Sequence, residues 1–301
     1  MIESGFNELS SPNKQMIMLG AMVDSEGQET LTEPLLSSFI QKQQGKGLAT
    51  VYFTDKWAES HIKCPIDKMN IARKYKCVPF IRLQNSEDPD GGSGKPGKYS
   101  HKNIAAGKWD TQLKQYASDL ASFGSPVLIE YGTEINGDWF DWSIEGPEPF
   151  KKAFRYIAKL MPPNVKMAFH CDATDNPNSP KWYPGDDVVS IVGSSVYGVE
   201  KKRGCLGVLD ICYNDFASIS KTKPLGIFEW GIGDPKDTLN TFTNLPLKYP
   251  RIELLQLWNE KVVKNHPEDN VPDGRIDVTP ENLKAYREGI SNPVYTTEYL
   301  L

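Results

Sequence analysis

Two glutamates each follow an apolar, strand-like run of the chain and have aromatic neighbours. Glu134 precedes Trp139, and Glu229 stands between Phe228 and Trp230. Carboxylates are seldom buried without a partner, so packing alone explains these positions poorly. Two such glutamates suit hydrolysis of a glycosidic bond, in which one carboxyl group protonates the leaving oxygen and the other attacks or activates water. The pair therefore predicts a carbohydrate-cleaving enzyme.

The composition of the 301-residue chain is that of a globular protein. Hydrophobic residues make up 39% and charged residues 24% of the chain, which is typical of a globular protein and not of a disordered or membranous one. The net charge of −5 argues against nucleic acid as the main partner. No apolar run reaches the roughly 18 residues needed to span a membrane. We expect a monomer whose partner is a polysaccharide or an oligosaccharide.

Cysteine usage and the N-terminal sequence bear on the compartment. An odd number of cysteines leaves at least one thiol free, so a disulfide framework is not expected. Residues 1–15 are polar and lack the apolar core of a signal peptide. A secreted enzyme without its leader would look the same, so the compartment stays open. The five cysteines are Cys64, Cys77, Cys171, Cys205 and Cys212.

Short apolar runs alternate with helix-like segments along the whole chain. Proline near the first turn suits several of these helices because its φ is already fixed. Strands are expected at 16–23, 48–53, 77–83, 127–131, 165–170, 188–196, 225–230 and 252–258. Helices are expected at 33–44, 65–76, 109–123, 147–160, 206–218, 235–243 and 280–289, the last with Thr279 as its N-cap.

Eight strands that alternate with helices predict a parallel sheet closed into a (β/α)8 TIM barrel, which we interpret as one catalytic domain over residues 1–301. The fifth unit departs from the pattern, because three prolines between His170 and Val188 leave no room for a full helix. In such barrels the active residues come from the C-terminal ends of the strands. Those ends hold Arg82, Glu134, His170, Tyr197, Glu229 and Trp258.

Structural explanations compete with a functional role at several of these positions. Glu134 would alternatively be a loop carboxylate in a salt bridge, and Arg82 would pair with an acid of the barrel. His170 would either contact substrate or form hydrogen bonds within the barrel mouth. Core packing is the alternative for the tryptophans of the proposed site, Trp139, Trp142 and Trp258.

Two other motifs resemble known sites but lack the required context. Residues 91–98 contain G-x-G-x-x-G and nearly a P-loop, yet Tyr99 stands where Ser or Thr should follow and no helix opens behind them. We expect a mobile loop on the rim of the active face. Residues 269–277 lack the calcium-loop spacing and are expected to form a turn. The four histidines lack zinc-ligand spacing, and a nucleophile elbow for a serine triad is missing. We expect neither metal nor cofactor.

Four segments together resemble glycoside hydrolase family 26. Residues 126–142 are similar to the acid/base signature of that family, in which a strand carrying an arginine ends in His-Glu-Met-Asn-Gly before Trp. Residues 182–193 resemble the run into its sixth strand, residues 223–229 its nucleophile strand and residues 275–281 the start of its closing helix. The resemblance runs from about the third strand to the C-terminus. It implies a retaining endo-β-glycosidase of the β-mannanase type.

The chain departs from the family pattern at three positions. Thr133 replaces the usual histidine, Glu130 stands where arginine is common, and Ser195 stands where mannan-acting members often carry aspartate. The resemblance places these positions around the sugar nearest the scissile bond. We therefore interpret the chain as a divergent member with weak or absent activity on plain mannan. β-Glucan and β-xylan are the alternative substrates, and a non-catalytic sugar-binding barrel is the alternative class.

The resemblance also implies a role for each matching residue. Glu134 would be the acid/base and Glu229 the nucleophile, with their carboxyl groups about 5–5.5 Å apart as retention requires. Tyr197 would hydrogen-bond the nucleophile, and Arg82 would help keep it ionised. The remaining expected sugar contacts are the floor formed by Trp258, stacking on Trp139, and contacts of Asn136 and His170.

Overall fold

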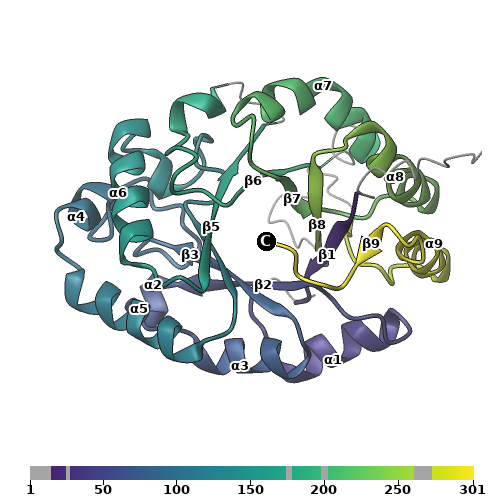
Figure 1. The fold of residues 1–301 in the computed structure, drawn as a ribbon, viewed down its shortest axis with the longest axis horizontal. Helices are drawn as coiled ribbons and strands as arrows, with labels where there is room; N and C mark the ends of the chain where they lie inside the picture. Colours follow the sequence, from purple (N-terminus) through teal and green to yellow (C-terminus); the bar gives the residue numbers. More distant parts are fainter. Residues whose placement is uncertain (1–14, 25–27, 174–177, 198–202, 261–272) are drawn as a thin grey trace, which may run out of the picture.

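Eight parallel strands close into a barrel in the computed structural model, which describes residues 15–24, 28–173, 178–197, 203–260 and 273–301 (Figure 1). Neighbouring strands pair in chain order, and β1 pairs with both β2 and β8 to close the ring. A short β9 (Tyr295–Thr296) adds to β1. The predicted (β/α)8 fold is confirmed. The barrel strands are β1 (Ile17–Met22), β2 (Thr50–Lys56), β3 (Val78–Gln84), β4 (Val127–Tyr131), β5 (Val165–Cys171), β6 (Ile191–Ser195), β7 (Leu225–Trp230) and β8 (Ile252–Trp258).

Helices surround the barrel, and all seven expected ones are present. Two short helices, α2 and α4, were not predicted because four or five residues give too little periodicity to read. None of the described helices is both long and apolar enough to cross a membrane. The helices are α1 (Glu33–Lys42), α2 (Trp57–Ser60), α3 (Ile66–Lys74), α4 (His101–Ala105), α5 (Asp110–Phe123), α6 (Pro147–Leu160), α7 (Gly204–Ser218), α8 (Pro235–Lys248) and α9 (Pro280–Ile290).

Local capping explains where the last two helices begin. The Asp234 side chain accepts from two backbone N–H groups in the first turn of α8. Thr279 accepts from Asn282 N at 3.1 Å at the start of α9, which confirms the predicted N-cap. A helix N-terminus leaves backbone donors unsatisfied, and these side chains supply the missing acceptors.

Helix α8 continues past the end that the sequence predicts. We expected it to stop at residue 243, but it runs to Lys248 with Pro246 inside it. Proline lacks the N–H that would bond the carbonyl four residues earlier, at Phe242. The hydroxyl of Tyr295 donates to that carbonyl instead, at 2.9 Å. A residue from the end of the chain thus satisfies the group that Pro246 cannot, and the helix persists.

The fifth unit lacks a full helix, as its prolines predict. Within the described part of the segment after β5, only the 3-10 helix η2 (Ser179–Trp182) forms before β6 begins. Another 3-10 helix, η1 (Asp141–Ser143), follows β4.

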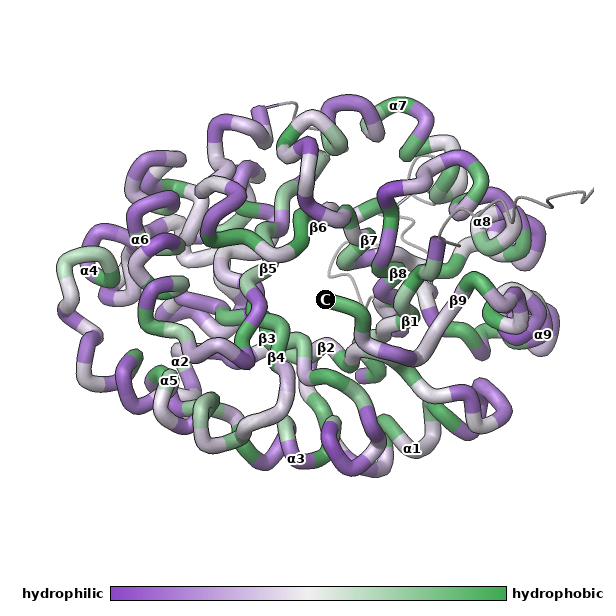
Figure 2. Tube along the Cα trace, in the orientation of Figure 1, coloured by the Kyte–Doolittle hydropathy of each residue, from purple (hydrophilic) through white to green (hydrophobic). Residues whose placement is uncertain are grey.

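Two sets of buried side chains form the core. One set fills the space between the barrel and its helices, and the other fills the barrel interior. Hydrophobic residues accordingly follow the strands and the inward faces of the helices in Figure 2. Inside the barrel, Tyr52 and Phe228 each pack edge-on against Phe80, with ring centroids 4.8 and 5.0 Å apart. The interior is therefore packed, and it supports a site only at its ends.

The C-terminal tail covers the N-terminal end of the barrel. Tyr299 and Leu301 pack against the barrel-interior set, and the backbone N–H of Leu300 lies 3.3 Å from the sulfur of Met18, near the start of β1. Figure 1 shows the C-terminus in the middle of the ring. The opposite end, where the strands finish, is the end that remains for a functional site.

Candidate active site

A cavity of about 260 Å³ lies at the C-terminal end of the barrel. Five residues predicted from strand ends line it: Arg82, Glu134, Tyr197, Glu229 and Trp258. A larger hollow of about 800 Å³ lies beside α8, but its lining has no paired strand-end carboxylates. The residues that line the smaller cavity with the predicted five are Glu29, Lys56, Gln84, Pro89, Asp90, Phe140 and Glu260.

The backbone at the end of β4 turns Glu134 into this cavity. Glu134 has a φ of +46°, which an L residue seldom adopts, and it follows Gly132 at +76°. The bonds from Ile135 N to His170 O (3.2 Å) and from Gly137 N to Glu134 O (2.9 Å) hold the turn. Strained backbone of this kind concentrates at functional sites.

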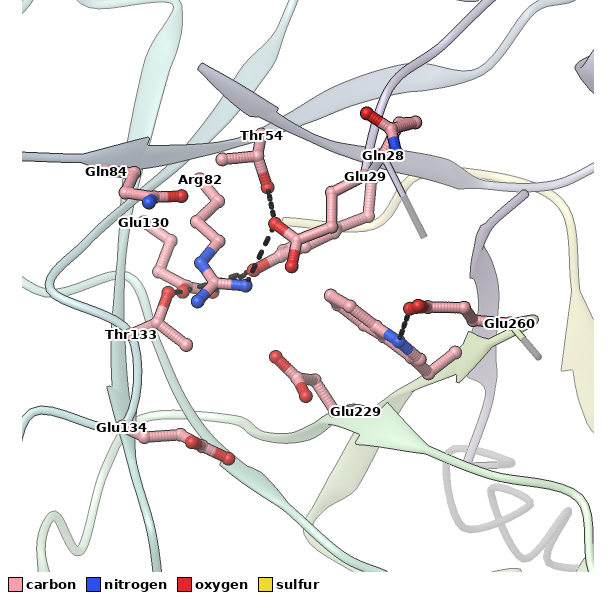
Figure 3. A network of polar contacts seen from close by, with 12 residues as sticks. Gln28, Glu29, Thr54, Arg82, Gln84, Glu130, Thr133, Glu134, Glu229 and Glu260 are labelled. Atoms are coloured by element: carbon pink, nitrogen blue, oxygen red, sulfur yellow. Dashed lines mark hydrogen bonds and ion pairs between the residues drawn. The ribbon is translucent and has the colours of Figure 1, made fainter. Parts of the chain in front are cut away.

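The two glutamates approach each other across the cavity. Carboxylate oxygens of Glu134 and Glu229 and a ring nitrogen of His170 all lie within 4.8 Å of one another. Figure 3 shows Glu134, Glu229 and Arg82 pointing into the same space. The register of β7 shifts against both neighbouring strands near Glu229, and such irregularities re-aim side chains.

Glu229 is buried but hydrogen-bonded. Its side chain is 7% exposed, and the Tyr197 hydroxyl donates to its Oε2 at 2.8 Å. Burial raises the pKa of Glu229 to about 8, and the charge of Glu134 adds to this effect, while His170 and Arg82 oppose it. Interacting carboxyl groups titrate as a pair. Near neutral pH the pair therefore holds one proton.

Arg82 forms part of a charged wall on the other side of the cavity. Its Nη1 lies 3.3 Å from Glu29 Oε2, and its guanidinium lies over the Phe140 ring at 5.3 Å. Thr54 Oγ1 also donates to Glu29 Oε2, at 2.6 Å. Burial opposes the charge of Arg82, yet the nearby carboxylates, Glu29 foremost, raise its pKa. Arg82 therefore stays cationic, and Figure 3 shows its contact with Glu29.

Another carboxyl group of the cavity, that of Glu260, lies just beyond the end of β8. The indole N–H of Trp258 donates to Glu260 Oε2 at 2.6 Å and so fixes the plane of its ring. Burial raises the pKa of Glu260 to about 7. Sequence reasoning missed Glu260 and Glu29, which belong to no motif. The one available signal for Glu260 was its place two residues beyond a strand-end tryptophan.

Three predicted sugar-binding residues have other surroundings. Asn136 is buried, and its side chain donates to Asp172 O at 2.7 Å and so joins the segments after β4 and β5. His170 is fully buried. Trp139 is 46% exposed, and its indole N–H donates to Glu134 Oε2 at 2.8 Å. All three lie next to the cavity glutamates or behind them. Their contacts with a sugar stay predictions.

The three departures from the family pattern are also buried. Thr133 and Ser195 are 1% and 3% exposed, Glu130 is fully buried, and none is among the residues that line the cavity. His170 lies beside Ser195, with its Nε2 3.0 Å from Ser195 Oγ.

The glycine-rich segment 91–98 lies beside the cavity and is tied to the barrel. The carboxylate of Asp141 accepts from Ser93 Oγ and Gly94 N, each at 2.7 Å. It also accepts from Ser86 Oγ at 2.7 Å and from Lys95 N at 3.3 Å. The bonds from Ser93, Gly94 and Lys95 attach the loop to Asp141, and its mobility stays a prediction.

Metal and disulfide chemistry can be judged from the described residues. The cluster of Glu134, His170 and Glu229 has the spacing of a metal site. Both ring nitrogens of His170 already face protein partners, however, which suits charge pairing better than ligation. In the calcium-like turn, residues 269–272 lie outside the described residues, and Asp273 pairs with Arg275. All five cysteines are buried, and no disulfide joins them.

Comparison with known proteins yields one family and several relatives. A sequence model of glycosyl hydrolase family 26 matches residues 101–228. Endoglucanase H of Acetivibrio thermocellus is 29% identical over 228 residues, which is 66% of this chain and 24% of that protein. Mannan endo-1,4-β-mannosidase of Thermothelomyces thermophilus is 27% identical over 182 residues, or 58% and 31%. The chain thus spans less than a third of the length of either relative.

Solved structures share the barrel. A β-mannanase from a symbiotic protist of the termite Reticulitermes speratus, solved with a gluco-manno-oligosaccharide, superposes with a TM-score of 0.64 at 18% identity, covering 94% of this chain and 89% of that one. A Cellulomonas fimi endo-β-1,4-mannanase gives a TM-score of 0.65 at 16% identity, with 93% and 72% covered. At these identities the likeness concerns the fold.

Proposed function

Since this chain belongs to glycoside hydrolase family 26, we propose that it is a retaining endo-β-glycosidase that hydrolyses a β-linked polysaccharide by double displacement. The observation that carries the proposal is the pair of glutamates in one cavity at the C-terminal end of the barrel. A cavity with two convergent carboxyl groups is typical of an acid/base site.

The spacing of the two glutamates supports retention. Their facing oxygens lie within 4.8 Å of each other. Retaining enzymes place the carboxyl groups about 5–5.5 Å apart, whereas inverting enzymes need about 6.5–9.5 Å to accommodate a water molecule. A carboxylate this close can reach the anomeric carbon directly, so attack by the enzyme is favoured over attack by water.

The reaction assigns a different task to each glutamate. Glu229 attacks the anomeric carbon and forms a glycosyl ester, while Glu134 gives its proton to the departing glycosidic oxygen. Glu134, now anionic, then removes a proton from water, and the resulting hydroxide displaces Glu229. Two inversions restore the original configuration. The single proton held by the pair is the one that Glu134 must carry when substrate is bound.

The surrounding residues support this division of roles. Tyr197 donates to Glu229 at 2.8 Å, and a hydrogen bond of this kind favours the carboxylate over the neutral acid. The cationic Arg82 lines the same cavity and also favours the carboxylate of Glu229. Trp258, fixed by Glu260, offers an apolar surface on which a sugar ring can stack.

β-Mannan is the first substrate to test, because several relatives are named for it. β-Glucan is the second candidate for a specific reason: Endoglucanase H matches a larger share of this chain than the mannosidases do. A β-1,3-xylanase of Vibrio is also similar, at 28% identity over 104 residues, which is 32% of this chain and 22% of that protein. β-1,3-Xylan therefore completes the set of substrates.

A reducing-end assay on mannan, mixed-linkage β-glucan, β-1,3-xylan and carboxymethylcellulose tests the proposal. We expect new reducing ends on at least one polymer and a rapid fall in its viscosity, which marks cleavage within the chain. Glu229→Ala should abolish turnover. Glu134→Ala should still turn over an aryl glycoside with a good leaving group, and added azide should be captured as a β-glycosyl azide. Binding without turnover on every polymer would instead identify a sugar-binding barrel.

A further inference from the structure

A buried polar network lies next to the two cavity glutamates. Glu130 from β4 faces His170 from β5, with Oε2 and Nδ1 3.0 Å apart. The other ring nitrogen of His170 lies 3.0 Å from Ser195 Oγ on β6. Thr133 Oγ1 donates to Glu130 Oε1, and the Tyr52 hydroxyl lies 3.2 Å from the same oxygen. Neighbouring strands thus fix one carboxylate against one imidazole.

All three departures from the family pattern belong to this network. Thr133 contacts Glu130 directly, and Ser195 reaches it through His170. These side chains therefore form one unit and are not three independent changes in a sugar pocket. We therefore look for the role of this network in its effect on the adjacent cavity glutamates.

The network holds an ion pair. Glu130 and His170 are both fully buried, and an isolated buried charge is costly, so each side chain requires the other. Burial opposes ionisation of both groups, but the imidazolium lowers the pKa of Glu130 and the carboxylate raises the pKa of His170. Thr133 and Tyr52 supply further hydrogen bonds to the carboxylate. The charged pair is therefore the form that its contacts favour.

The cationic end of the pair lies beside the reacting groups. His170, Glu134 and Glu229 place a nitrogen and two carboxylate oxygens within 4.8 Å of one another, while the His170 ring packs edge-on against Phe228 at 5.2 Å. The charges that act on His170 are Glu130, Glu229 and Glu134. Those that act on Glu229 are Glu134, His170, Arg82 and Glu130.

We propose that the Glu130–His170 ion pair is a positioning device that holds a permanent positive charge beside Glu229 and so directs the shared proton of the two cavity glutamates onto Glu134. The idea rests on the double displacement proposed above, in which Glu229 attacks as an anion. His170 does not touch substrate in this scheme. It acts through Glu229.

The same cation affects the two glutamates unequally. Glu229 is only 7% exposed, whereas Glu134 is more accessible to water, which screens charges. Of the two cavity glutamates, Glu229 has the larger effect on the pKa of His170. Loss of the positive charge on His170 therefore destabilises the anionic form of Glu229 more than the anionic form of Glu134. The proton would then move toward Glu229, and attack on the anomeric carbon would be suppressed.

Nitrogen NMR on the unmodified enzyme tests the first half of the proposal. The chain has only four histidines, so ¹⁵N-histidine spectra are simple, and His170→Gln identifies the signals of His170. We expect both ring nitrogens of His170 to carry protons at neutral pH. In Glu130→Gln the ring should lose its extra proton at a lower pH than in the unmodified enzyme. A neutral His170 in the unmodified enzyme at pH 7 would overturn the proposal, and this measurement requires no variant to fold.

Carboxyl-carbon NMR tests the second half, with Glu229→Gln used to assign the signal. In His170→Gln we expect the midpoint of the Glu229 titration to rise by about one to three pH units, since an opposite charge within a few ångströms shifts a pKa by that amount. Glu130→Gln should raise it similarly. Ser195→Ala, which deletes a hydrogen bond but no charge, is the matched control and should give a smaller rise. An unmoved midpoint in folded His170→Gln would refute the proposal.

Kinetics separate this idea from the proposed function. The acid limb of kcat/KM should move to higher pH in His170→Gln, while a merely structural role would lower kcat at every pH alike. A rise in the Glu229 midpoint in an enzyme that cleaves none of the four polymers would support the electrostatic device and reject the hydrolase. Polymer cleavage by the enzyme, with no rise of the Glu229 midpoint in His170→Gln, would support the hydrolase and reject the electrostatic device.

Discussion

Replacing Asp141 with alanine should destabilise the protein and widen the cavity that holds the two glutamates. The Asp141 carboxylate is buried and accepts three hydrogen bonds at 2.7 Å, from Ser86, Ser93 and Gly94, and a longer one from Lys95. Hydrogen bonds to a charged group contribute about 1.5–3 kcal/mol each, so the three short bonds sum to at least about 4.5 kcal/mol. Rehydration of the exposed loop groups offsets part of this, and we expect a net loss of about 3 kcal/mol.

Urea denaturation at pH 7 measures this loss directly. Asp141→Asn keeps one acceptor oxygen and should lose about half as much. Asp138→Ala, three residues earlier and exposed, is the matched control and should change stability by less than about 0.5 kcal/mol. Equal effects of Asp141→Ala and Asp138→Ala would refute the reasoning, because the four hydrogen bonds to Asp141 would then contribute nothing to stability.

Two further results are expected for Asp141→Ala, one in the pH dependence of stability and one in the kinetics. Burial opposes ionisation of Asp141, but the Ser93, Ser86 and Gly94 donors outweigh it and lower the pKa of Asp141. Its contribution to stability is therefore present above the ordinary aspartate pKa and is lost as the pH falls through the lower folded value. The difference between wild type and Asp141→Ala should shrink in strong acid. Because Pro89 and Asp90 line the cavity, KM should also rise more than kcat falls.

Three other predictions concern the cavity and the barrel. Since burial and Glu134 raise the pKa of Glu229 to about 8, the pair should lose its last proton there, and kcat/KM should fall above about pH 8; an activity flat to pH 10 would contradict a shared proton. Tyr197→Phe removes the 2.8 Å bond to Glu229 and should lower kcat about tenfold with little change in KM, which initial-rate kinetics would check. Gly20→Ala would place a methyl 2.1 Å from Gln256 Oε1 and 2.2 Å from Thr50 Oγ1, so thermal melting should show a loss of about 1–3 kcal/mol, whereas Gly47→Ala, with open space around it, should melt like wild type.

Local sequence pattern was enough for the architecture and for the two glutamates. Apolar runs of strand length between helical segments predicted eight strands, and the structure contains them in that order. A parallel barrel gathers the C-terminal ends of its strands at one face. The residues predicted at those ends could therefore be assigned to one cavity before the structure was known, and five of them line it: Arg82, Glu134, Tyr197, Glu229 and Trp258. The prolines after β5 and the cap at Thr279 were readable for the same reason, because each acts on its own neighbours in the chain.

The partners of those side chains were decided by tertiary structure alone. His170 meets Glu130 across 40 positions of sequence and Ser195 across 25, and Glu29 reaches Arg82 across 53. Neither periodicity nor spacing encodes such contacts, because they depend on strand register and on how far each loop folds over the barrel mouth. Helix α8 shows the same limit, since its last turn depends on a hydroxyl from Tyr295. Sequence placed the carboxyl groups at one end of the barrel, whereas burial and long-range pairing decided which of them carry charge.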